Sequence, residues 1–194
     1  MTENPKKVVC LSGKRKTGKD YVADKLHASL PGSVIIRLSA PIKKYWSESR
    51  ALDMDQLMSD SVYKETHRAE MITWGEEKRK QDPEFFCKSA IEMANGNDFP
   101  IWIVSDLRRQ TDINFFCDNY NERVTYVRIS ASDETRKQRG FTPTIGVDDA
   151  ESECGLDHIA NWDMVIENNG NGSDLEDNLD VLIRICRNAL YDAL

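Results

Sequence analysis

The stretch GKRKTGKD, residues 13–20, decides the fold that this sequence predicts. It follows the apolar run KKVVCLS at residues 6–12 and opens a helical pattern that extends from about residue 18 to residue 30. A glycine-rich turn between a buried strand and a helix matches the phosphate-binding loop, G-x-x-x-x-G-K-S/T. The backbone N–H groups of such a turn point at phosphate oxygens, and Lys19 would reach the β- and γ-phosphates of a nucleotide.

Asp20 departs from this pattern, because the last position usually carries Ser or Thr. The usual hydroxyl binds Mg²⁺, and a carboxylate is also a hard oxygen ligand for that ion. We therefore expect Asp20 to help to hold Mg²⁺, with Asp106 as a direct or indirect partner. The alternative is that Asp20 only favours the first turn of the helix through the helix dipole. The added negative charge would be offset by the cations of the loop: Lys14, Arg15, Lys16 and Lys19.

Strand-like and helix-like patterns alternate along the whole chain. Apolar strand-like runs cover residues 6–12, 33–39, 100–106, 124–130 and 164–168. Helical patterns cover about residues 18–30, 41–60 with a break near 52–53, 61–80, 84–94, 109–119, 132–139 and 174–191, and residues 140–160 are irregular. This alternation predicts an α/β fold in three layers, with a parallel five-stranded sheet that carries helices on both faces.

Length and composition indicate one soluble domain. The 194 residues include no run of about 20 apolar residues, no linker and no signal-peptide pattern. The net charge of −7 argues against nucleic-acid binding, and it is unevenly distributed: residues 1–140 carry +3 and residues 141–194 carry −10. Five scattered cysteines without a C-x-x-C motif indicate reduced thiols. We expect a cytosolic monomer that binds small molecules and neither nucleic acid nor membrane.

Basic residues recur where a second substrate would lie. Ligands of such sheets bind beyond the carboxyl ends of the strands, and Arg108 and Arg109 directly follow one of them. The cluster at residues 78–80 could bind a ligand or form a solvated face, because Glu76 and Glu77 adjoin it. The clusters are Lys43 and Lys44, Lys64 and Arg68, Lys78 to Lys80, and Arg108 and Arg109.

Two further observations narrow the chemistry. Arg136, Lys137 and Arg139 precede the irregular segment, which suits a lid that closes on phosphates and excludes water. The three histidines are dispersed, without the spacing of a metal site or a catalytic triad, so each is more simply structural: His27, His67 and His158. The sequence therefore favours phosphoryl transfer over hydrolysis by an activated nucleophile.

Several segments together resemble the phosphomevalonate kinase family of the animal type: GKRKTGKD, RLSAPIKK, VYKETHRAEMITWGEEKR, DPEFFC, PIWIVSDLRRQTD, RKQRG and GVDDAESECGLD with VIENNG. The resemblance extends from about residue 8 to residue 190 and includes Asp20. It implies a three-layer P-loop kinase fold similar to that of nucleoside monophosphate kinases. Residues 1–194 would form one domain, with an acceptor-binding region at about 41–96 and a lid at about 136–160.

The resemblance also implies a reaction. ATP would be the co-substrate, with Mg²⁺, and its γ-phosphoryl group would pass to (R)-5-phosphomevalonate, giving (R)-5-diphosphomevalonate and ADP. This step belongs to the mevalonate route to isoprenoids and sterols. An acceptor phosphate is already a nucleophile at neutral pH, so alignment and charge would supply the catalysis. The expected catalytic residues are Lys19, Arg15, Arg108 and Arg109.

Matching the family motifs assigns the remaining contacts. Those to ATP fall on Lys14, Arg15, Lys16, Thr17, Gly18, Lys19, Asp20, Arg139, Asn169 and Asn178. Those to phosphomevalonate fall on Lys43, Lys64, Arg68, Arg79, Arg108, Arg109 and Asn168. Asn169 stands where the family often has His, and Asn178 where it often has Gln.

Two other functions fit the same loop. A nucleoside monophosphate kinase would catalyse the same class of reaction with a different acceptor. A nucleotide-dependent binding module would bind ATP without turnover, although Lys19 and the many arginines argue against it.

Overall fold

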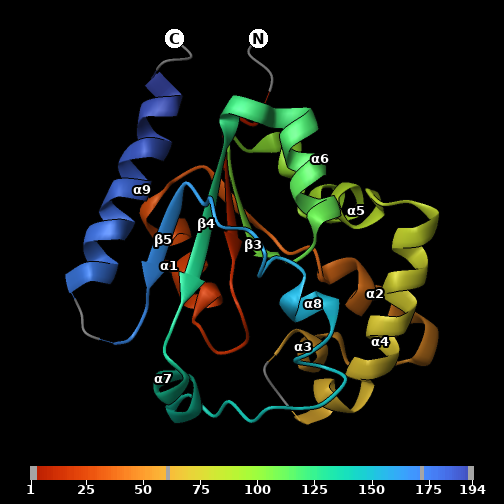
Figure 1. Cartoon of the computed structure of the whole chain (residues 1–194). Helices are drawn as coiled ribbons and strands as arrows, with labels where there is room; N and C mark the ends of the chain where they lie inside the picture. The colour runs from red at the N-terminus through yellow and green to blue at the C-terminus, as the bar shows by residue number, and fades with distance from the viewer. Residues whose placement is uncertain (1–3, 60–61, 171–172, 192–194) are drawn as a thin grey trace.

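The computed structural model describes residues 4–59, 62–170 and 173–191; for residues 62, 64, 65 and 173 it describes the backbone alone. Five strands of the described chain form one parallel sheet in the order β2-β3-β1-β4-β5 (Figure 1). They are β1 (Lys7–Ser12), β2 (Ser33–Ile36), β3 (Ile101–Leu107), β4 (Val124–Ser130) and β5 (Met164–Glu167). This confirms the predicted α/β fold.

Helices follow the strands as the patterns predict. They are α1 (Lys19–Ser29), α2 (Ala40–Arg50), α3 (Met54–Met58), α4 (Val62–Gln81), α5 (Phe85–Met93), α6 (Gln110–Tyr120), α7 (Asp133–Gln138), α8 (Glu151–Cys154) and α9 (Ser173–Tyr191). Two 3-10 turns lie at Gly96–Asp98 and Asn121–Arg123. Within the described ranges, none of the helices combines the length and the apolar character that crossing a bilayer requires.

The central strand β1 is buried along its whole length, and its four inner residues, Val8 to Leu11, are apolar. Val8 and Cys10 face α5 and α6, whereas Val9 and Leu11 face α1 and α9. In Figure 1 these two pairs of helices lie on opposite sides of the sheet. A parallel sheet covered in this way exposes only its strand ends to ligands. A smaller apolar cluster around Trp46, Leu57 and Met71 joins α2, α3 and α4.

The chain departs from the predicted boundaries in two places. Strand β2 ends at Ile36 rather than near residue 39, because the N–H groups of Leu38 and Ser39 donate to the Asp106 carboxylate and not to a neighbouring strand. The short helix α8 also lies inside the segment 140–160 that the sequence predicts to be irregular. The predicted break near residues 52–53 is present, since Asp53 caps α3 by accepting from Gln56 N at 3.1 Å.

Asp112 holds the start of α6 against the rest of the fold. Its carboxylate is fully buried and accepts from the N–H groups of Arg108 at 3.1 Å and Arg109 at 3.0 Å. It also pairs with Arg79 of α4 at 2.7 Å. One buried carboxylate thus caps a helix and links it to a second helix that lies far away in the sequence.

Replacing Asp112 with Ala should lower the free energy of unfolding by about 3–5 kcal/mol, because it leaves the Arg79 charge and two backbone N–H groups without their partner. Urea unfolding followed by circular dichroism measures this loss. Asp118→Ala, at an exposed position of the same helix, is the matched control and should change the stability by less than about 0.5 kcal/mol. Equal losses in the two variants would contradict the role given to Asp112.

Candidate active site

The loop at residues 13–20 has the shape that its sequence predicts. Gly18 adopts φ 93° and Gly13 adopts φ 151°, and a Cβ atom on Gly13 would collide with the backbone oxygen of Ile129. The Lys19 ammonium is buried and donates to the backbone oxygens of Gly13 at 2.6 Å and Lys14 at 3.2 Å. The loop therefore closes around the lysine that would meet the phosphates.

Burial lowers the pKa of that lysine. Removal from water and, to a smaller extent, the nearby Arg108 guanidinium lower the pKa of Lys19 to about 8, against the opposing effect of Glu153, Asp20 and Asp106. A polyanion that binds beside Lys19 would favour its charged form and so raise its pKa.

Asn168, directly after the edge strand β5, and Arg139, at the end of α7, hold the loop in place. Asn168 Nδ2 donates to Thr17 O at 2.9 Å, and Arg139 donates both to Thr17 O and to Asn168 O. Any side chain at Gly18 would collide with Asn168 Nδ2. Beside them opens a second pocket of about 520 Å³, lined by Gly18, Tyr21, Arg139, Glu167, Asn168, Asn169, Gly170, Asp174, Leu175 and Glu176.

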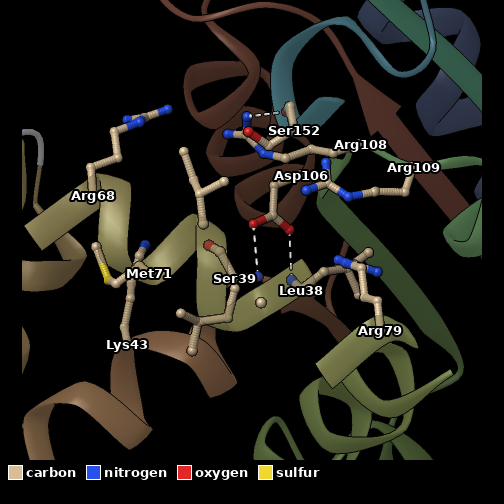
Figure 2. A pocket seen from close by; sticks show the side chains of 13 residues that line it. Leu38, Ser39, Lys43, Arg68, Met71, Arg79, Asp106, Arg108, Arg109 and Ser152 are labelled. Atoms are coloured by element: carbon tan, nitrogen blue, oxygen red, sulfur yellow. Dashed lines mark hydrogen bonds between the residues drawn. The ribbon is translucent and has the colours of Figure 1, made fainter. Parts of the chain in front are cut away.

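A cationic pocket of about 130 Å³ opens beyond the ends of β2 and β3 (Figure 2). Its cations come from three separate parts of the chain: Lys43 on α2, Arg68 and Arg79 on α4, and Arg108 and Arg109 after β3. One side of α4 lines it, at a helical spacing of three or four residues. The other lining residues are Leu38, Ser39, Ile42, Met71, Ile72, Gly75, Asp106 and Ser152.

Asp106 forms the floor of this cationic pocket. Its two carboxylate oxygens accept from Leu38 N at 2.6 Å and from Ser39 N at 3.0 Å, as Figure 2 shows. Burial would raise the pKa of this carboxyl, but Arg108, the Ser39 hydrogen bond and Lys43 outweigh it and hold the pKa below its ordinary value. Asp106 therefore stays ionised and attracts the cations toward the pocket floor.

The arginines of the cationic pocket are held by carboxylates of the chain itself. Arg79 pairs with Asp112 at 2.7 Å, and Arg109 pairs with Glu76 of α4. Arg68 and Arg108 share one carboxylate, that of Glu153 on α8. Each of these pairs restricts a long side chain to one position, so the pocket is organised before any ligand enters.

Carboxylates of the segment 148–157 likewise form ion pairs with the phosphate-binding loop. Asp148 lies 3.1 Å from the Arg15 guanidinium, and Asp157 lies 2.7 Å from the Lys14 ammonium. Arg136 Nε donates to the backbone oxygen of Arg15 at 2.9 Å. The region that the sequence predicts to be a lid thus contacts both the loop and the cationic pocket.

The structure brings most of the predicted residues into two groups. Arg139 and Asn169 line the second pocket beside the loop, and Asn168, matched to the acceptor in the sequence, lines this pocket too. Lys43, Arg68, Arg79, Arg108 and Arg109 all line the cationic pocket. Of the cluster 78–80, Arg79 alone is among the lining residues of that pocket.

Other predicted residues lie elsewhere. Asp20 is exposed on the first turn of α1, and Lys44 lies near Glu48 at 3.9 Å. Asn178 donates to the backbone oxygen of Asp174, one turn before it on α9. The side chain of Lys64 lies outside the described residues, although its backbone belongs to α4.

Sequence reasoning assigned no role to several residues that shape the site. Met71, Ile72 and Gly75 stand at helical spacing between Arg68 and Arg79, a pattern that would have placed them on the same face. Asp148 and Glu153 lie in the quoted motif GVDDAESECGLD, but nothing local in the sequence names their partners.

A phosphate-binding loop beside a cationic pocket, at the carboxyl edge of a parallel sheet, defines a P-loop kinase. Residues 11–122 match the model of the family described as phosphomevalonate kinase. A phosphomevalonate kinase of Drosophila melanogaster is 45% identical over 166 residues, which cover 84% of this chain and 88% of the fly protein. The chain belongs to the phosphomevalonate kinase family, and as a member of a kinase family it uses ATP.

Solved structures of other kinases share the fold at low sequence identity. A gluconokinase from Sinorhizobium meliloti 1021 aligns over 100% of both chains with a TM-score of 0.53 and 11% identity. An APS kinase from Mycobacterium tuberculosis aligns over 95% of this chain and 99% of its own, with a TM-score of 0.50 and 13% identity. Both confirm the three-layer P-loop kinase fold.

The pKa of Lys19 predicts a pH dependence. The value kcat/KM for ATP should fall as the pH rises above about 8, because the free protein loses the ammonium charge that would meet the phosphates. Bound phosphates would favour the charged form, so kcat should persist to higher pH. Steady-state rates from about pH 6.5 to about pH 9.5 measure both profiles.

Lys19→Arg is the control, since a guanidinium stays charged throughout this range. Its residual kcat/KM should lack the decline above about pH 8. A wild-type profile for kcat/KM that stays level to about pH 9.5 would contradict the assignment.

Proposed function

We propose that this protein transfers the γ-phosphoryl group of ATP to the phosphate of (R)-5-phosphomevalonate. The observation that carries the proposal is the cationic pocket, which combines five cations with an apolar wall of Leu38, Ile42, Met71 and Ile72. Phosphomevalonate has a phosphate and a carboxylate at the ends of a short aliphatic chain. Cations suit its two anionic groups, and the apolar wall suits the carbon chain between them.

The proposed reaction is an in-line displacement. An oxygen of the acceptor phosphate forms a bond to the γ-phosphorus, and the bond from that phosphorus to the β–γ bridging oxygen breaks. The products are ADP and (R)-5-diphosphomevalonate. The acceptor phosphate is already ionised at neutral pH, so the site has no need of a strong general base.

The chain's own residues would align the reactants and offset their charge. Lys19 would meet the β- and γ-phosphates, and Arg15 and Arg139 would add charge from the loop and beyond α7. Arg108 and Arg109 would hold the acceptor phosphate, with Lys43, Arg68 and Arg79 around the rest of the molecule. Two polyanions repel each other, so this charge lowers both the cost of binding and the barrier to transfer.

The residues near the loop fit a Mg²⁺ ion. This ion prefers octahedral oxygen ligands and is commonly held by one or two carboxylates together with substrate phosphates. Asp20 would supply such an oxygen from its exposed position at the start of α1, and Asp106 would act through water, since both of its oxygens already accept backbone hydrogen bonds. When bound with ATP, the ion would neutralise charge on the β- and γ-phosphates.

The acceptor can be tested by measuring ADP release from MgATP with (R)-5-phosphomevalonate, mevalonate, AMP, UMP, CMP or GMP. We expect turnover with phosphomevalonate alone, because the cationic pocket suits a doubly anionic, short-chain acceptor. Lys19→Met should abolish it and serves as a control for contaminating kinases. Turnover with a nucleotide would favour a nucleoside monophosphate kinase, and ATP binding without turnover would favour a binding module.

The role of Asp20 can be tested by calorimetric titration of ATP with and without Mg²⁺. Asp20→Ala should reduce the gain in ATP affinity that Mg²⁺ gives by about 10- to 100-fold. Asp20→Ser should retain part of it, because it restores the usual hydroxyl. Asp24→Ala, at an exposed position one turn further along α1, is the control. Unchanged Mg²⁺ dependence with lowered stability in Asp20→Ala would instead support the helix-dipole role.

A further inference from the structure

Glu153 is a buried carboxylate that pairs with two of the arginines of the cationic pocket. It lies on α8, and its side chain is 2% exposed. Burial would raise the pKa of this carboxyl, but Arg108, Lys19 and Arg68 outweigh it and hold the pKa below its ordinary value. The group is therefore an anion in the midst of cations that would meet substrate phosphates.

The two arginines paired with Glu153 come from separate parts of the fold. Arg68 Nη2 lies 2.8 Å from Glu153 Oε1, and Arg108 Nη1 pairs with the same oxygen. Arg68 belongs to α4, whereas Arg108 follows β3. In Figure 2 their guanidinium groups extend toward one another above Asp106. A single oxygen atom thus fixes the spacing of two cations across the cationic pocket.

Helix α8 is itself held in place. Arg108 Nη1 also donates to the backbone oxygen of Ser152 at 2.9 Å. A Cβ atom on Gly155 would collide with Glu151 O at 2.6 Å and would lie 3.1 Å from Arg108 O, so the end of α8 packs tightly against the chain after β3. These contacts make α8 a wall of the cationic pocket that carries Glu153 at a defined position.

We propose that Glu153 is a positioning residue, which sets the guanidinium groups of Arg68 and Arg108 for the acceptor. This inference rests on the proposed function, because the acceptor is the ligand that these arginines would meet. Glu153 acts through the arginines and does not itself touch the substrate. Its charge offsets their mutual repulsion, and its shared oxygen limits the orientations that each side chain can adopt.

Glu153 could instead act as a competitor of the acceptor, and the two roles predict opposite effects. A carboxylate beside the acceptor site could compete with the acceptor for the same two arginines. Removing its charge would then improve binding of the acceptor, whereas removing a positioning charge would weaken it. The direction of the change in affinity decides between the two.

The test compares wild type, Glu153→Gln and Glu151→Gln in steady-state kinetics with MgATP and (R)-5-phosphomevalonate. Glu153→Gln keeps the size of the side chain and removes the charge, and we expect it to raise KM for phosphomevalonate by roughly 10- to 100-fold. KM for ATP should change by much less, because Glu153 pairs directly with Arg68 and Arg108 and acts on Lys19 only through its charge. Glu151 is exposed on the same helix, so its variant should behave as wild type.

A double-mutant cycle with Arg68→Met separates positioning from general damage. If Glu153 acts through Arg68, the double variant should raise KM for phosphomevalonate by less than the product of the two single effects. Glu153→Asp covers the case in which Glu153→Gln does not fold. It keeps the charge but shortens the side chain by one methylene group, and it should still raise KM for phosphomevalonate. Independent, multiplicative effects would overturn the proposal.

The proposed function and this inference fail in different ways. If wild type does not turn over phosphomevalonate, the proposed function fails before any variant is compared. If wild type does so and folded Glu153→Gln has an unchanged or lowered KM for phosphomevalonate, the positioning role is wrong while the function stands.

Discussion

The pairing of buried cations with buried carboxylates is the constraint on which this structure depends. A site for two polyanions needs many positive charges close together, and burying them without partners would cost several kcal/mol for each ion. The chain meets this demand with carboxylates that come mostly from distant segments, since 85 residues separate Arg68 from Glu153 and 133 separate Arg15 from Asp148. The cationic pocket and its contacts with the phosphate-binding loop are therefore complete only when the whole chain has folded.

Two of these carboxylates also connect the site to the sheet. Asp106 draws the chain after β2 toward the end of β3, and Asp112 caps α6 while it holds Arg79. Both carboxylates therefore combine a structural and an electrostatic task. The geometry of the cationic pocket is thus set by the rigid strand ends, which is where a parallel sheet offers its most precise positions.

The sequence predicted most of the fold and the separate elements of the site, because these depend on local patterns. The loop at residues 13–20, five apolar strands and the basic residues after β3 are all local features. The end of β2 was predicted three residues too far along, since only the tertiary contact with Asp106 ends the strand. Pairings such as that of Glu153 with Arg68 could not be predicted, because the two residues lie 85 positions apart and no local sequence pattern connects them.

The net charge of this molecule and the charge of its cationic pocket have opposite signs. The chain carries −7 overall, and residues 141–194 alone carry −10, yet four arginines and a lysine converge on one small pocket. At long range the net negative charge repels an approaching anion. At short range the cations that line the pocket attract it. An approaching anion thus meets repulsion first and attraction only near the carboxyl edge of the sheet.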